Sequence, residues 1–140
     1  MAIFQIPTAV QNAIADLVVD RLDAGSGAGR LRIYDGDDAT LPPVNSAADG
    51  TLLVEITLDD PAYGAASSGA AALNDLDPTN WIADGTADYF RLVDSDNNLV
   101  AQGDVTVTAG SGTLKLSSVT AVTGSPVDVQ SLTITMPNGV

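Results

Sequence analysis

Residues 86–108 read TADYFRLVDSDNNLVAQGDVTVT, two runs rich in aromatic and β-branched residues on either side of a short Asp/Ser/Asn cluster. This arrangement is typical of a β-hairpin. The apolar positions of each run share one face: Phe90 and Leu92 in the first, and Leu99, Ala101, Val105 and Val107 in the second. Gly103 interrupts the second run and predicts a bulge or a close approach of another group. The stretch indicates a mainly β chain.

Apolar and polar residues alternate on both sides of the hairpin, which predicts further strands. These strands begin near residue 31 and end near residue 136, with segments at 31–35, 51–58, 114–116 and 131–136. In 51–58 the alternation places Leu52, Val54, Ile56 and Leu58 on one face. In one regular strand, Val127 and Val129 would point to the face opposite Leu132, because they are an odd number of positions away from it. This predicts a bulge or a break near Gln130–Ser131. Half-buried strands of this kind predict a β-sandwich in a single domain, residues 1–140.

One helix is predicted at about residues 8–24. Val10, Ile14, Leu17 and Val18 recur at helical spacing, and Asp16, Asp20 and Asp23 lie away from this stripe. An apolar stripe normally packs on its own domain. The alternative is a helix that is exchanged with a neighbouring subunit or docked on a larger assembly, which makes these four residues candidates for an interface.

Two long irregular stretches, 35–50 and 59–85, separate the strands, and such stretches are usually functional or disordered. The Ala/Gly/Ser tract at 62–72 suits either a flexible loop or an extended arm whose small side chains allow tight packing against a neighbour. Tyr63 and Trp81 lie in the second stretch and complete the set of candidate interface residues. Trp81 also suits a plug over the edge of the core, the commoner role of a lone Trp.

Charge and missing residue types exclude several functions. The 140 residues include 18 acidic and five basic residues, a formal net charge of −13, so we expect neither nucleic acid nor an anionic membrane as a partner. The chain has no Cys and no His, which excludes thiolate or imidazole zinc sites and His-dependent nucleophiles. We therefore expect no enzyme, no cofactor and no metal site.

The cluster at the centre of the hairpin partly matches a calcium-binding loop. Asp94, Asp96 and Asn98 stand at positions 1, 3 and 5 of that pattern. Leu99 stands where the pattern needs Gly, and Val105 where it needs Glu, so a hairpin turn is favoured. The DGDD segment at 35–38 is interpreted in the same way, with weak cation binding left open.

The carboxylate pairs in the sequence give no specific support for a catalytic site either. Asp59 and Asp60, like Asp75 and Asp77, stand beside prolines in predicted loops, and adjacency has little weight among 18 acidic residues. Lys115, the one Lys, falls in a predicted strand. A hydrolase therefore has no specific support from the residues.

Four segments in this order resemble a family of small structural proteins of tailed-bacteriophage virions: GRLRIYDG (29–36), GTLLVEITLDDPAYGAASSGA (50–70), GTADYFRLVDSDNNLVAQGDV (85–105) and VQSLTITMP (129–137). The resemblance covers nearly the whole chain. It implies a jelly-roll-like antiparallel β-sandwich with one N-terminal helix that decorates or cements a capsid. It carries no catalytic residues over to this chain.

The resemblance implies a virion protein that bridges capsomers, bound to the major capsid protein and to copies of itself, with a trimer as the first guess. A neck, tail or fibre component that acts as an attachment module is the alternative. The N-terminus lacks the positively charged region of a signal peptide, and no window approaches the roughly 20 apolar residues of a membrane span. We therefore expect assembly in the host cytoplasm, without secretion by a signal peptide.

Overall fold

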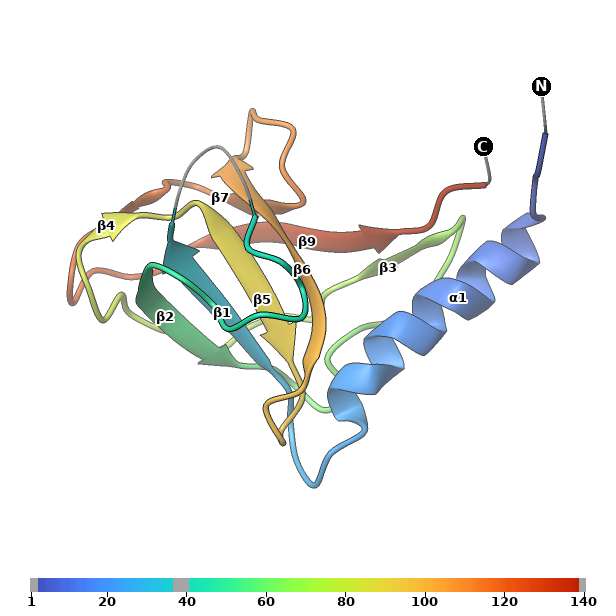
Figure 1. Cartoon of the computed structure of the whole chain (residues 1–140), viewed down its shortest axis with the longest axis horizontal. Helices are drawn as coiled ribbons and strands as arrows, with labels where there is room; N and C mark the ends of the chain where they lie inside the picture. Colours follow the sequence, from blue (N-terminus) through green and yellow to red (C-terminus); the bar gives the residue numbers. More distant parts are fainter. Residues whose placement is uncertain (1–2, 37–40, 139–140) are drawn as a thin grey trace.

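The computed structural model describes residues 3–36 and 41–138 (Figure 1). Its elements are α1 (Thr8–Asp20), the 3-10 helix η1 (Arg21–Asp23), β1 (Arg30–Asp35), β2 (Thr51–Thr57), β3 (Ala70–Ala72), β4 (Gly85–Thr86), β5 (Tyr89–Val93), β6 (Leu99–Val107), β7 (Leu114–Leu116), β8 (Thr120–Ala121) and β9 (Val129–Thr135). The prediction of a mainly β chain with an N-terminal helix is confirmed, and α1 with η1 covers the predicted range closely.

Seven strands form a mixed sheet in the order β2-β1-β5-β6-β7-β9-β3, and β4 pairs with β8 in a separate ribbon. The neighbours are antiparallel except β6 and β7, which run parallel. Among the strands that the structure describes, the expected antiparallel pairing therefore holds for every pair of neighbours except this one. The parallel pairing is short, because it joins only Val105–Val107 to Leu114–Leu116. The connection at 108–113 therefore has to return the chain past only three residues of β6 before β7 begins.

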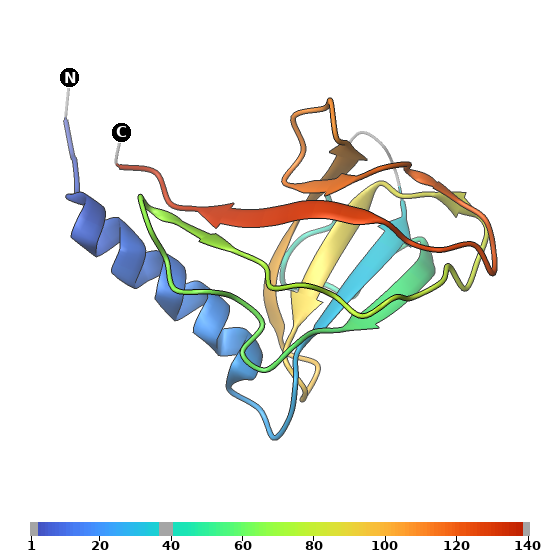
Figure 2. The same cartoon turned by 180° about the vertical axis from the view of Figure 1, so that it is seen from behind.

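The sheet folds over so that its two halves face each other across one core. In Figure 2, β9 crosses in front of β1 and β5. One cluster of buried side chains draws on both halves, with Leu31, Ile33, Phe90 and Leu92 from β1 and β5, and Leu114, Leu116, Leu132 and Ile134 from β7 and β9. Each fully buried aliphatic or aromatic side chain contributes about 1.5–3 kcal/mol, so this cluster is the main source of stability.

Two predicted irregularities are confirmed. Gly103 lies opposite Phe90, and a Cβ at Gly103 would lie 2.8 Å from the Phe90 ring, so only Gly allows this approach. In β9, Ser131 pairs with Lys115 and Val129 with Leu116, which leaves Gln130 as the bulged residue.

The alternation expected for 51–58 is broken by a bulge in β2. Ile33 pairs with Val54 and Tyr34 with Leu52, so Leu53 has no partner in the register. Leu53 and Val54 are consequently both buried, and Leu52 is partly exposed.

The described part of the first long loop is fastened to the outer face of β5 and β6. Arg91 donates from Nη1 to the Ser46 carbonyl at 2.9 Å, and Gln102 Nε2 donates to the Pro42 carbonyl at 2.6 Å. The Tyr89 hydroxyl donates to the Asp49 carbonyl at 2.6 Å. Residues 37 and 38, half of the predicted DGDD turn, lie outside the described residues.

Candidate interaction surface

Helix α1 faces the rest of the chain with a side that the sequence pattern did not predict. Ala15 and Val19 are buried, as is Leu22 in η1, and the polar Gln11 is buried with them. The predicted stripe points the other way: Val10, Ile14 and Leu17 are 42%, 37% and 64% exposed. Val18 lies at the margin, partly buried against the core. The helix therefore packs on its own domain, as the first interpretation had it, but through Ala15, Val19 and Leu22, while Val10, Ile14 and Leu17 of the stripe stay outside.

Polar side chains on α1 and η1 instead bind the backbone of the 59–73 segment, which runs along the helix in both views (Figures 1 and 2). Asn12 Oδ1 accepts the N–H of Gly69 at 2.7 Å, and Asp16 Oδ1 accepts the N–H of Ala66 at 2.7 Å.

Asp23 Oδ1 of η1 accepts the N–H of Ala62 at 3.2 Å. Burial raises the pKa of Asp23, and this hydrogen bond opposes that shift. The three bonds satisfy amides of a segment with little regular structure of its own, which explains why Asn12, Asp16 and Asp23 face the chain beside the buried apolar residues.

The small residues of the 62–72 tract make this contact possible. Gly69 has φ +78°, a left-handed conformation that favours glycine, and a Cβ there would lie 2.9 Å from Gln11 Oε1. The tract is thus an extended arm, and it packs against the chain's own helix.

We call Val10, Ala13, Ile14 and Leu17 the helix face; all four are exposed. Ile3 and Phe4, just before the helix, are also exposed. The segment from Ile3 to Ala15 contains no charged residue, and the next one, Asp16, binds Ala66. An uncharged, apolar surface on a chain with a net charge of −13 is a candidate for protein contact.

A groove of about 380 Å³ adjoins the helix face, between the C-terminal half of α1 and the start of β6. Leu17 and Val18 line it on the helix side, and Leu99 and Val100 on the strand side. Arg21, Asp94 and Asn98 also line the groove, which is therefore partly polar. Leu17 belongs to both features and joins the groove to the helix face.

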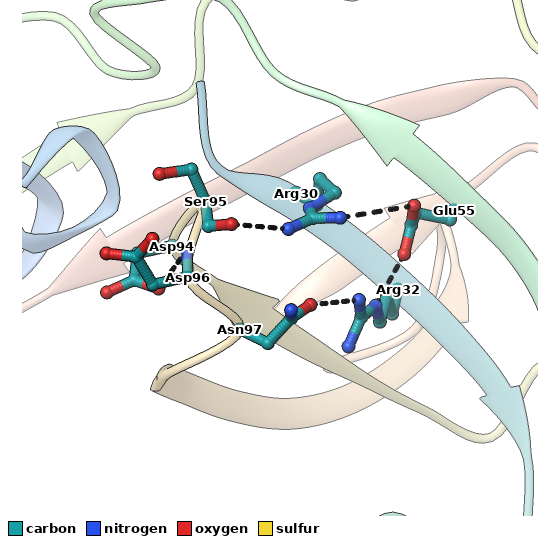
Figure 3. Close-up of polar contacts among 7 residues, drawn as sticks. All are labelled: Arg30, Arg32, Glu55, Asp94, Ser95, Asp96 and Asn97. Carbon is teal, nitrogen blue, oxygen red and sulfur yellow. Dashed lines mark hydrogen bonds and ion pairs between the residues drawn. The ribbon is translucent and has the colours of Figure 1, made fainter. Parts of the chain in front are cut away.

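The tip of the β5–β6 hairpin forms the rim of this groove and is held by its own hydrogen bonds (Figure 3). Asp94 Oδ1 accepts the N–H groups of Asp96 and Asn98, each at 2.9 Å, and Asp94 Oδ2 accepts Asn98 Nδ2 at 2.9 Å. The Asn98 side chain, which contributes most, and the two amides lower the pKa of Asp94. The interpretation of this cluster as a turn is confirmed, since the Asp94 carboxylate is engaged in closing it.

Arginines of β1 connect the same tip to β2 (Figure 3). Arg30 Nη2 donates to the Ser95 carbonyl at 2.8 Å, and Arg32 Nη2 donates to Asn97 Oδ1 at 2.7 Å. Both arginines also contact Glu55, at 3.8 Å from Arg30 and 2.6 Å from Arg32. This network serves to fix the hairpin tip.

Tyr63 and Trp81 do not belong to the candidate surface. Both are buried in the core cluster, so the prediction that they form an interface is corrected. The Tyr63 hydroxyl finds no hydrogen-bond partner among the described residues, and burial raises its pKa. Trp81 takes the alternative role of a core plug.

The acidic residues that the structure describes do not gather into a metal centre. In the part of the chain that it describes, no group of three or more Asp, Glu, His or Cys is placed to hold a metal ion. Asp75 and Asp77 line a second groove of about 670 Å³ between residues 73–79 and 126–132. Within residues 3–36 and 41–138, no helix is long and apolar enough to cross a membrane.

No protein-family model, no curated protein and no solved structure matches this chain. The resemblance to tailed-phage virion proteins therefore stays a prediction.

Proposed function

We propose that this protein is a structural component of a bacteriophage particle that decorates or cements the capsid. The observation that carries the proposal is the helix face, which presents Val10, Ile14 and Leu17 outward from a chain with a net charge of −13. Apolar patches of this kind mark protein–protein contacts.

The remainder of the chain suits a rigid building block. The hairpin tip, the described part of the 35–50 loop and the 59–73 segment are each fastened by side chains to the sheet or to α1. A cement protein needs such rigidity because it must hold neighbouring capsomers at a fixed spacing. Each contact can be weak, since many copies on one particle add avidity.

Quantitative mass spectrometry of purified particles that encode this chain tests the proposal. A decoration protein is expected at a copy number comparable to that of the major capsid protein. A few copies per particle would assign the chain to the neck, tail or fibre instead, and its absence from particles would contradict a virion role.

Cementing is tested separately from decoration. Particles assembled without this chain are expected to release their DNA at a lower temperature than complete particles, and added purified protein should restore the difference. Unchanged release temperatures would show that the chain does not cement the capsid.

A further inference from the structure

We infer that the groove between residues 73–79 and 126–132 binds an extended, basic segment of another protein. The groove has a volume of about 670 Å³, and no residue of α1 lines it. It is therefore a second surface, separate from the helix face, and the inference does not depend on the capsid.

The groove opens where the chain that follows β3 leaves the edge of β9 (Figures 1 and 2). Two hydrogen bonds close its ends: the Leu73 N–H donates to the Leu132 carbonyl at 3.2 Å, and the Val127 N–H donates to the Thr79 carbonyl at 2.9 Å. Between these bonds the two segments, both within the described chain, share no hydrogen bond.

The first part of β9 therefore has a free edge inside the groove. β7 pairs with Val129, Ser131 and Leu132 on one side of β9, whereas β3, on the other side, pairs only with residues 133–135. A strand edge without a neighbour is a site where an extended peptide adds through backbone hydrogen bonds. This indicates that the occupant is an extended segment.

The side chains of the groove walls suit alternate residues of such a segment. Leu73 and Leu76 on one wall, and Val127 and Val129 on the other, are apolar and only partly buried. Successive side chains of an added strand point to opposite faces, so every second residue of the occupant can contact these walls. We expect an apolar residue at those positions.

Charge indicates that the other positions are basic. The groove is also lined by Asp75, Asp77 and Asp128, whose side chains are exposed, and by no Lys or Arg. Within the described residues, none of these three carboxylates has a hydrogen bond or an ion pair. Unpaired carboxylates favour a partner with Lys or Arg, and they disfavour a second copy of this chain, which carries a net charge of −13.

The first test is the binding of a short fluorescent peptide of alternating Lys and Val, measured by fluorescence anisotropy. The wild-type chain is expected to bind it and not a peptide of alternating Glu and Val. Asp75→Asn combined with Asp128→Asn should weaken binding at least about threefold, because two ion pairs are lost. Asp20→Asn combined with Asp96→Asn is the control, since it removes the same charge from exposed positions outside the groove.

Three results of this test would overturn the inference. The first is no binding of the Lys/Val peptide to the wild-type chain, and the second is equal binding of the Glu/Val peptide. The third is equal weakening by the two double variants, which would show only a general attraction to an acidic chain. Circular dichroism spectra of both variants should match that of the wild type, because all four substituted side chains are exposed.

The second test examines the addition of the peptide as a strand. Two Lys/Val peptides carry N-methyl groups on alternate residues, in the two possible registers, and so lack the N–H donors of one edge or of the other. One register is expected to abolish binding and the other to preserve it, because only one edge of an added strand pairs with β9. Equal affinities would overturn the inference.

The outcome is separable from that of the proposed function. A chain that binds the peptide but is absent from particles would contradict the virion role and leave the groove's assignment standing. A chain that is present on particles and does not bind the peptide would do the reverse.

Discussion

Asp16 and Ala66 are joined by a 2.7 Å hydrogen bond from the Ala66 N–H to Asp16 Oδ1, across 50 positions of sequence. The contact turns a charged residue of α1 toward the chain and leaves the apolar stripe outside. This bond and those of Asn12 and Asp23 hold the helix in this orientation together with the burial of its apolar residues Ala15 and Val19, and the candidate surface follows from it.

Asp16→Ala should lower the free energy of unfolding by about 1–2 kcal/mol, because it removes a hydrogen bond to a charged acceptor and leaves an amide without its partner. Asp20→Ala is the control, since Asp20 is an exposed carboxylate on the same helix, and it should change stability little. Urea denaturation measures both. Equal effects would mean that the Asp16 contact does not hold the helix.

The orientation of α1 is tested more severely by placing an Asp on each side of it. Ala15 is fully buried, so Ala15→Asp buries an unpaired carboxylate and should cost more than about 3 kcal/mol. Leu17→Asp should leave the monomer folded, because Leu17 is exposed. Thermal unfolding followed by circular dichroism compares the two, and the reverse order would refute the arrangement described.

Tyr63→Phe should stabilise the protein by about 1 kcal/mol, since it removes a buried hydroxyl that has no partner among the described residues. Tyr89→Phe should destabilise it by a similar amount, because the Tyr89 hydroxyl donates to the Asp49 carbonyl. Chemical denaturation of the pair checks the prediction. A loss of stability in Tyr63→Phe would show that its hydroxyl is satisfied.

Alkaline pH should weaken the fold through Tyr89. Burial and the nearby Asp49 raise its pKa to about 12, so the folded state keeps a proton that the unfolded state loses near the ordinary value of 10.0. The contribution of Tyr89 to stability is therefore constant below about pH 10 and falls from there to about pH 12, by at most about 1.4 kcal/mol per pH unit. Burial of Tyr63 acts in the same direction. Unfolding free energies at several pH values should fall less steeply in Tyr89→Phe, and an unchanged slope would contradict the assignment.

Asp94→Ala should destabilise the chain by about 1–2 kcal/mol, because the Asp94 carboxylate accepts three hydrogen bonds within the hairpin tip. Asp96→Ala, at an exposed position of the same tip, should be nearly neutral. A calcium titration of the wild-type chain belongs with this pair. Stabilisation by calcium would contradict the structural role given to Asp94.

Most strands could be predicted because their signals are local, whereas β3, β4 and β8 are two or three residues long and were not predicted. Gly103 interrupts the apolar pattern of its strand, which predicted the close approach. Val129 and Leu132 are three positions apart and cannot share a face of one regular strand, which predicted the bulge. The bulge at Leu53 was not, because its residues continue the apolar pattern and only the pairing of β1 with β2 exposes the shift.

The orientation of α1 could not be predicted from spacing. Helical periodicity identifies an apolar stripe but assumes that the stripe faces the core of the same chain. Here the inward side combines the buried Ala15, Val19 and Leu22 with polar side chains that bind backbone amides of the 59–73 segment, and amides leave no signature in the residue types. The same limit applies to Tyr63 and Trp81, whose burial depends on partners distant in sequence.

An electron-microscopy reconstruction of particles that encode this chain tests the virion role most directly. We predict density for the chain in many symmetry-related positions on the outer face of the capsid, each bridging neighbouring capsomers. Density confined to the neck, tail or fibres, or no density for the chain anywhere on the particle, would contradict the proposal.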